Sequence, residues 1–256
     1  MHPAADALGR VAAFGPHAAV VFGSGLAGLP PGAVVKAEIG YEELGWPCTA
    51  VSGHGNVLQL AETTAGATGG LRLALACGRP HGYEGWPREE LERPVRCLAA
   101  AGVSRFVLIN SCGALRPAVT PGDLVVCTVV VDLQAAPVGV APPGLDVCSA
   151  PEATAVAAAM APARTGVYVA VAGPQFETPA EVTWLARHGD VVGMSGAPEV
   201  RAVRAAGAGC CLLALVVNRA AAVGSHEDVL AVGGRLAGTL AAGLGAVVMA
   251  RWPGLV

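Results

Sequence analysis

The stretch Gly78–Pro87, GRPHGYEGWP, places four side chains with chemical function within six residues. The whole chain has only 16 Lys plus Arg, six His and three Tyr. Arg79 offers a planar fork of donors that suits a phosphate, and His81 adds a further donor. Tyr83 combines an apolar ring with a hydroxyl, and Glu84 can orient His81. We expect this stretch to bind a phosphate-like anion, with the Tyr83 ring able to face a sugar; the alternative is an ordinary surface loop.

A glycine-rich turn, GSGLAG at 23–28, follows the apolar run Ala18–Phe22 and formally matches the dinucleotide fingerprint G-x-G-x-x-G. That fingerprint requires a helix to begin in the loop, and Pro30 and Pro31 leave no room for one. The motif favours a tight turn whose backbone N–H groups and Ser24 hydroxyl hold one small anion. A purely structural turn and a dinucleotide loop remain as alternatives.

Two later strand ends present functional groups toward one crevice. Phe176 and Glu177 follow one apolar run, and Met194 and Ser195 follow the next. They supply an aromatic ring, a carboxylate, a thioether and a hydroxyl. Phe176 and Met194 are equally consistent with core positions.

Three further polar residues are candidates. Asn218 ends the apolar run CLLALVV, where it either forms a turn or pairs with a heterocycle that has adjacent donor and acceptor edges. His226 is at the beginning of the last expected helix and is either solvated or a ligand for a hydroxyl. His54, between two glycines in SGHGN, is either a ligand or an ordinary loop histidine.

The scaffold is expected to be an α/β fold with a central mixed β-sheet flanked by helices. Short, continuous apolar runs predict strands covered on both faces. They lie at 18–23, 56–62, 71–77, 105–110, 123–132, 167–173, 190–194 and 211–218. Proline and acidic residues at the start and glycine at the end predict helices at 87–102, 179–189 and 198–207, and a long helix is expected over 225–252. The proline-rich segment Leu133–Pro151 is expected to be a loop that acts as a lid or an interface element.

Composition excludes several classes of protein. The length suits a single domain over residues 1–256, and 54% hydrophobic residues provide a large core. The net charge of −3 and the scattered arginines argue against nucleic-acid binding. No signal-like segment or membrane span is apparent, so a cytoplasmic location is expected. The eight cysteines form no metal-binding spacing and are expected to be buried apolar residues.

Several motifs resemble, in order and character, the trimeric purine nucleoside phosphorylase family. They are GSGLAG, GHGN, GRPHGYEGWP, NSCGAL, GPQFETPAE, VVGMSGAPEV, and VVNRA with HEDVL. The chain departs from the family's pattern in NSCGAL, which replaces NAAGGL, and at Gly196, which replaces a threonine. The segment VDLQAAPVGVAPPGLD is shortened and has no aromatic residue. CGAL and VDLQ are also similar to the related 5′-methylthionucleoside phosphorylases.

The resemblance implies roles for the candidate residues. The phosphate site would be Ser24, His54, Arg79, His81, Ser195 and the backbone of Ser111. Ribose would contact Tyr83, Met194 and His226, and the purine would contact Phe176, Glu177 and Asn218. His81, Glu177 and Asn218 would be catalytic, with no metal ligand among them.

The implied reaction is phosphorolysis of inosine, guanosine and their 2′-deoxy forms to the free purine and (deoxy)ribose 1-phosphate. Inorganic phosphate would be a co-substrate, no cofactor would be needed, and a cytoplasmic homotrimer in purine salvage is expected. Glu177 would accept the N1–H that adenine lacks, so adenosine would be a poor substrate. Two alternatives are a phosphorylase of 5′-modified nucleosides such as 5′-methylthioinosine, and a low-turnover nucleoside-binding protein.

Overall fold

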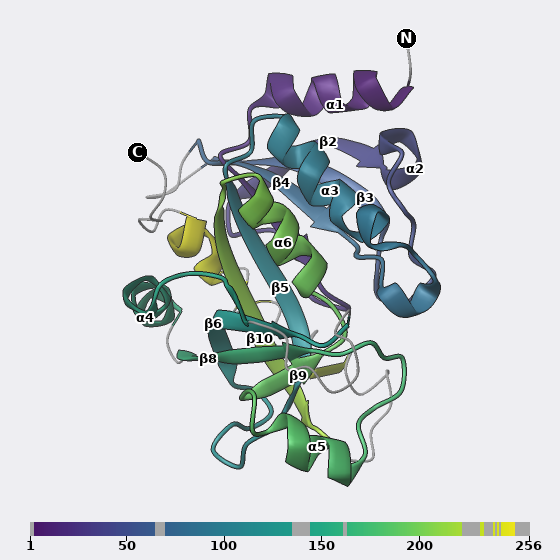
Figure 1. Cartoon of the computed structure of the whole chain (residues 1–256). Helices are drawn as coiled ribbons and strands as arrows, with labels where there is room; N and C mark the ends of the chain where they lie inside the picture. Colours follow the sequence, from purple (N-terminus) through teal and green to yellow (C-terminus); the bar gives the residue numbers. More distant parts are fainter. Residues whose placement is uncertain are drawn as a thin grey trace.

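The computed structural model describes residues 3–64, 70–134, 144–160, 163–221, 231–232, 238, 240 and 242–248 (Figure 1). Within them, ten strands form one mixed sheet. The strands are β1 Ala18–Phe22, β2 Ala33–Gly40, β3 Val57–Thr63, β4 Arg72–Cys77, β5 Arg105–Ala114, β6 Leu124–Asp132, β7 Gly144–Asp146, β8 Ala163–Ala170, β9 Val191–Gly193 and β10 Gly209–Arg219. The helices are α1 Pro3–Phe14, α2 Tyr41–Leu44, α3 Arg88–Ala100, α4 Ala150–Ala159, α5 Pro179–Leu185 and α6 Ala197–Ala205, with a 3₁₀ turn at Gly82–Glu84.

Strand β5 joins the two parts of the sheet. It lies parallel to β1 and β10 and antiparallel to β9. The pairings β5–β10–β6–β8–β9–β5 form a closed circuit, while β1, β4, β3 and β2 extend from β5 as an open arm. The expected mixed α/β sheet is therefore confirmed, but its closed half was not predicted.

Strands β1 and β9 pair with different parts of β5. Strand β1 pairs with β5 as far as Ile109, and β9 begins to pair at Gly113. Between these points, residues 110–112 of β5 have neither β1 nor β9 beside them. Ligands of α/β sheets bind where adjacent strands diverge, so this gap positions the candidate site.

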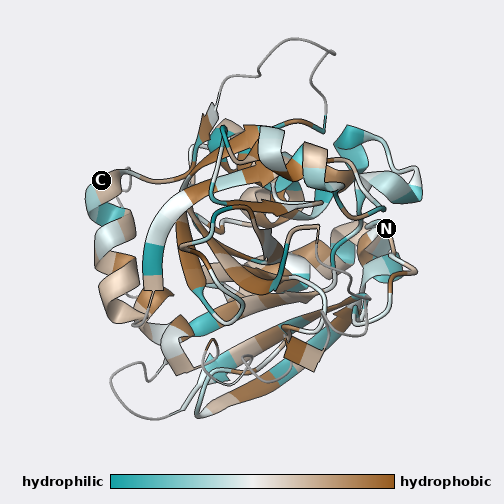
Figure 2. Ribbon diagram, turned by 90° about the horizontal axis from the view of Figure 1, so that it is seen from below, coloured by the Kyte–Doolittle hydropathy of each residue, from teal (hydrophilic) through white to brown (hydrophobic). Residues whose placement is uncertain are grey.

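Both faces of the sheet are covered, as the continuous apolar runs predict. Alternate residues of the inner strands point to opposite faces, so Val21 and Leu108 pack in one core and Val20 and Val107 in the other. Helices α1, α3 and α6 cover the first core, and α4 packs in the second. Figure 2 shows the hydrophobic residues concentrated in the strands at the centre of the molecule.

The glycine turn after β1 leads into β2 without a helix, as the two prolines predict. The expected loop at Leu133–Pro151 is partly wrong, because β7 pairs with β6 and α4 begins at Ala150. The Glu152 carboxylate accepts from the Ser149 backbone N–H at 2.6 Å, and Pro151 lies in the first turn, where proline is compatible with a helix start. Residues 135–143 lie outside the described part of the chain.

The expected C-terminal helix is helical at 231–232, 238, 240 and 242–248, and its remaining residues are outside the described ones. Five of the eight cysteines are buried and three are half-buried, and all eight are free thiols. Burial raises the pKa of Cys77 and of Cys148 to about 11, so both remain protonated at neutral pH. Among the described helices, none is long and apolar enough to cross a membrane.

Candidate active site

A cavity of about 190 Å³ opens at the gap beside β5. Its wall comes from the turn after β1, the loop after β4, the middle of β5, the segment after β8, the β9–α6 turn and the end of β10. Ten of the residues predicted for the site line it: Ser24, Arg79, His81, Tyr83, Ser111, Phe176, Glu177, Met194, Ser195 and Asn218. His54 is not on this wall, and His226 lies outside the described residues.

We call one end of the cavity the anion end, defined by Ser24, Arg79, His81, Ser111 and Ser195. A second group of lining residues, Phe176, Glu177 and Asn218, we call the aromatic end.

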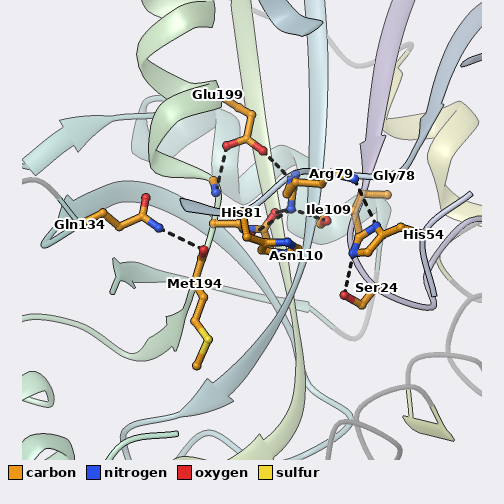
Figure 3. Close-up of polar contacts among 12 residues, drawn as sticks. Ser24, His54, Gly78, Arg79, His81, Ile109, Asn110, Gln134, Met194 and Glu199 are labelled. Carbon is orange, nitrogen blue, oxygen red and sulfur yellow. Dashed lines mark hydrogen bonds and ion pairs between the residues drawn. The ribbon is translucent and has the colours of Figure 1, made fainter. Parts of the chain in front are cut away.

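Arg79 is the centre of the anion end and is 1% exposed. Its Nη1 donates to Asn110 Oδ1, to the Ile109 carbonyl at 3.3 Å and to Ser195 Oγ at 3.3 Å. Its Nε forms an ion pair with Glu199 Oε1 at 2.5 Å (Figure 3). Nη2 has no hydrogen-bond partner among the described residues. A buried guanidinium with one donor group unused is suited to an anion that brings its own oxygens.

Asn110 and Glu199 were missed by the sequence analysis. Asn110 was counted only as the end of a strand, yet it is fully buried and its Nδ2 lies 3.1 Å from the Tyr168 hydroxyl and 3.3 Å from Ser195 Oγ. Glu199 was interpreted only as an early acidic residue of a helix. A lone amide inside an apolar strand, and an acid three residues after a glycine cap, were the available signals.

His54 connects the glycine turn to the loop after β4. The Arg79 backbone N–H donates to His54 Nδ1 at 3.2 Å, and His54 Nε2 lies 2.9 Å from Ser24 Oγ. A neutral imidazole that accepts at Nδ1 carries its proton on Nε2, so it donates to Ser24. Ser24 can then turn its own hydroxyl proton toward an anion in the cavity.

Glu84 holds the His81 loop in place, as the sequence analysis expected. Its carboxylate accepts from the His81 backbone N–H at 2.8 Å, and its Oε2 is 3.4 Å from His81 Nδ1. It also accepts from the Thr49 hydroxyl at 2.9 Å. The His81 ring stacks on Tyr83 with a centroid distance of 4.8 Å. Burial, with a contribution from Glu84, raises the pKa of Tyr83 to about 12, so its hydroxyl stays a donor at neutral pH.

One part of the cavity wall depends on a close approach at Gly173. This residue has φ +71°, and a Cβ there would overlap Met194 Sδ and come within 3.0 Å of Tyr83 Cδ1. Gln134 Nε2 donates to the Met194 carbonyl at 3.0 Å and the Val171 carbonyl at 3.1 Å, so it ties the two segments together (Figure 3). Tyr83 and Met194 therefore meet at one point of the wall.

The aromatic end is more open. Phe176 is 40% exposed, and burial raises the pKa of the half-buried Glu177, with a smaller contribution from Glu181. Asn218 follows a register shift in β10 between Val216 and Asn218. Such a bulge redirects the side chain that follows it, and Asn218 lines the cavity.

The geometry provides an anion subsite of arginine, histidine and serine donors joined to an apolar subsite with one carboxylate and one amide. Among the described residues, no three His, Cys, Asp or Glu side chains are grouped to hold a metal ion. The arrangement suits a ligand with a planar heterocycle at one end and an anion at the other.

Known proteins are similar to this chain along most of its length. The model of the phosphorylase superfamily matches residues 41–248. Purine nucleoside phosphorylase 1 of Bacillus subtilis is 31% identical over 254 residues, which cover 89% of this chain and 92% of the relative. The purine nucleoside phosphorylase of Mycobacterium tuberculosis is 35% identical over 245 residues, covering 90% and 88%.

Solved structures agree with the sequence relatives. A Schistosoma purine nucleoside phosphorylase in complex with hypoxanthine superimposes with a TM-score of 0.76 at 26% identity, covering 97% of this chain and 98% of the other. Isoform 2 of the Schistosoma mansoni enzyme, in complex with cytosine and ribose-1-phosphate, gives a TM-score of 0.78 at 26% identity, covering 96% and 94%. The chain thus belongs to the phosphorylase superfamily, in which its relatives are purine nucleoside phosphorylases.

Proposed function

We propose that this protein catalyses the phosphorolysis of purine nucleosides, with inosine and guanosine preferred over adenosine. The observation that carries the proposal is that both groups of residues, the anion end and the aromatic end, line one cavity. Arg79 and Ser195 are suited to phosphate, and Phe176, Glu177 and Asn218 are suited to a 6-oxopurine. Tyr83 and Met194 line the same cavity and are suited to contact a ribose that joins the two.

The proposed reaction needs no metal or organic cofactor. A phosphate oxygen attacks C1′ while the C1′–N9 bond breaks, and the bond electrons pass to the purine. Positive charge develops on the ribose and negative charge on the purine. Phosphate held by Arg79, His81, Ser24, Ser195 and the backbone of Ser111 lies beneath the ribose and stabilises the positive charge.

Asn218 stabilises the departing base by donating from its amide to N7 or O6 of the purine. Glu177 accepts from N1–H, and from the 2-amino group of guanine. Adenine has no N1–H, so the half-buried carboxylate would lose its partner with adenosine. Phe176 provides an apolar face against which the base stacks.

The 5′ side of the ribose is assigned to His226 on the family resemblance alone. If the shortened segment after β6 leaves this side open, 5′-methylthioinosine would be accepted as well. The same resemblance leads us to propose a homotrimer located in the cytoplasm. Light scattering tests the assembly, since a trimer has three times the 25.4 kDa mass of one chain.

The test compares four nucleosides at saturating phosphate: inosine, guanosine, adenosine and 5′-methylthioinosine. We expect kcat/KM for inosine and guanosine to exceed that for adenosine by at least about 100-fold. Binding is measured separately by thermal shift, because a structural neighbour holds adenosine. Nucleoside binding without turnover of any of the four would favour a nucleoside-binding protein, and turnover of 5′-methylthioinosine alone would favour the 5′-modified class.

A further inference from the structure

We propose that Glu199 is a positioning residue that holds Arg79 and the Ser195 turn in one fixed arrangement for phosphate. The inference rests on the proposed function in that it takes the anion to be inorganic phosphate. Glu199 does not line the cavity. It therefore acts through the two residues that do.

Both oxygens of the Glu199 carboxylate are used. Oε1 lies 2.5 Å from Arg79 Nε, and Oε2 accepts from the Gly196 backbone N–H at 3.0 Å (Figure 3). Arg79 comes from the loop after β4, whereas Gly196 and the adjacent Ser195 belong to the turn between β9 and α6. One side chain thus joins two segments that are more than 100 residues apart in the sequence.

The other contacts of Arg79 and Ser195 depend on the link that Glu199 makes between the two segments. Arg79 Nη1 and Asn110 Nδ2 each lie 3.3 Å from Ser195 Oγ, so the guanidinium, the amide and the hydroxyl meet at one place. Nη1 donates to protein acceptors and Nε is held only by the ion pair with Glu199, so Nη2, which has no hydrogen-bond partner among the described residues, is left for the ligand. Glu199 is 5% exposed and Arg79 1% exposed, so water does not replace either partner easily.

The turn between β9 and α6 has little room for a side chain at Gly196. Gly196 has φ +88°, and a Cβ there would lie close to Asn110 Nδ2. A residue with a side chain would therefore push against the amide that orients Ser195. The turn is held by the Glu199 hydrogen bond instead of by a side chain of its own.

Two substitutions at Glu199 distinguish a positioning role from an effect of its negative charge. Glu199→Gln removes the charge and leaves one acceptor oxygen, which can pair with Arg79 or with Gly196 but not with both. Glu199→Asp keeps the charge, but it is one methylene shorter and cannot span the two partners. By charge alone, Glu199→Gln would tighten phosphate binding, since it removes an anion near the site, and Glu199→Asp would leave binding unchanged. A positioning role predicts weaker binding in both variants.

The experiment measures the Kd for inorganic phosphate by calorimetry without nucleoside, and then the KM for phosphate and for inosine separately. We expect both variants to weaken phosphate binding by at least about 10-fold, while the KM for inosine changes by less than about two-fold. The control is Glu92→Gln, which removes a carboxylate that pairs with Arg201 of α6 at 3.3 Å and does not touch the cavity. This control should leave phosphate binding within about two-fold of the parent protein.

The outcomes distinguish this inference from the proposed function. Unchanged or tighter phosphate binding in Glu199→Asp, or equal rises in the KM for phosphate and inosine, would overturn the positioning role. If the parent protein binds phosphate but does not cleave inosine, the proposed function fails and the calorimetric comparison still decides the role of Glu199. If one variant does not fold, the other still tests the inference, because both are expected to weaken phosphate binding.

Discussion

At the anion end of the cavity, Arg79 is 1% exposed and is hydrogen-bonded to the fully buried Asn110, whereas at the aromatic end Phe176 is 40% exposed. The anion end is built around strand ends and the middle of β5. Phe176 and Glu177 are on the segment between β8 and α5, and Asn218 is at the end of β10. A buried, hydrogen-bonded side chain binds a ligand with little ordering cost, whereas an exposed side chain must be ordered by its ligand. Substitutions at the anion end should therefore affect both stability and activity, and those at the aromatic end mainly activity.

The largest effect is expected for Arg79→Ala. It removes the main phosphate donor and leaves Glu199 as a buried carboxylate without its partner, which costs about 3–5 kcal/mol of unfolding free energy. We also expect kcat/KM for phosphate to fall by at least about 10³-fold. Urea unfolding and steady-state kinetics measure the two effects. The control, Arg204→Ala, removes an exposed pair with Asp146 and should change stability by less than about 0.5 kcal/mol. An Arg79→Ala protein as stable as the control would contradict the comparison.

Asn218→Ala is expected to have the next largest effect on activity. Loss of a donor to the departing purine should lower kcat by about 10²- to 10³-fold. The Kd for phosphate should stay near that of the parent protein, because Asn218 contacts no residue of the anion end through a hydrogen bond among the described residues. Calorimetry with phosphate and single-turnover kinetics with inosine check both statements. A parallel loss of phosphate binding would show that the two ends are not independent.

Glu177→Gln should lower kcat/KM for inosine by about 10- to 100-fold and reduce the preference for inosine over adenosine. Because burial raises the pKa of Glu177, the parent protein should lose affinity for inosine as pH falls through a value above the usual carboxyl range. The KM for inosine, measured against pH in both proteins, tests this. In Glu177→Gln the KM for inosine should not rise at acid pH. If it still rises, the titrating group is a residue other than Glu177.

The raised pKa of Glu177 also determines the direction in which folding stability changes with pH. The folded state holds the Glu177 proton more tightly than the unfolded state, so this stabilisation is present at acid pH and is lost as pH rises through the folded pKa. Glu177→Gln should therefore be at least as stable as the parent protein at neutral pH while being less active. Thermal unfolding at about pH 4 and about pH 7.5 measures the difference. A marked loss of stability at neutral pH would mean that the carboxylate is a structural element.

Phe176→Ala is expected to have the smallest effect. The loss of stacking should raise the KM for inosine by about 10-fold, with little change in kcat. Because the ring is 40% exposed, stability should stay within about 0.5 kcal/mol. Thermal unfolding and steady-state kinetics check this. A larger loss of stability would place Phe176 with the core residues, which is the interpretation that the sequence left open.

The sequence predicted the parts of the fold that depend on local pattern. Continuous apolar runs located eight strands, and the two prolines after the glycine turn correctly predicted that no helix begins there. Strand β2 was missed because its residues alternate between half-buried and exposed positions, with Lys36 and Glu38 among the exposed side chains. Helix α1 was missed because only Ala7 and Val11 are buried along its length.

The sequence predicted the residues that line the site, but it did not predict the residues that hold them in place. Ten of the predicted residues line one cavity, because each follows or ends a strand whose position the apolar pattern indicated. The roles of Asn110 and Glu199 could not be predicted, since they depend on which strands pair with β5 and on the turn at Gly196. The closed circuit of strands brings together segments that no local sequence pattern identifies as neighbours.

The central claim is that one cavity binds phosphate and a purine nucleoside together and transfers the sugar between them. The most direct measurement is the product balance from inosine, with and without inorganic phosphate, with hypoxanthine and ribose 1-phosphate quantified in the same reaction. We predict equal amounts of hypoxanthine and ribose 1-phosphate when phosphate is present, and neither when it is absent. Hypoxanthine released with free ribose, at a rate that does not depend on phosphate, would contradict the account.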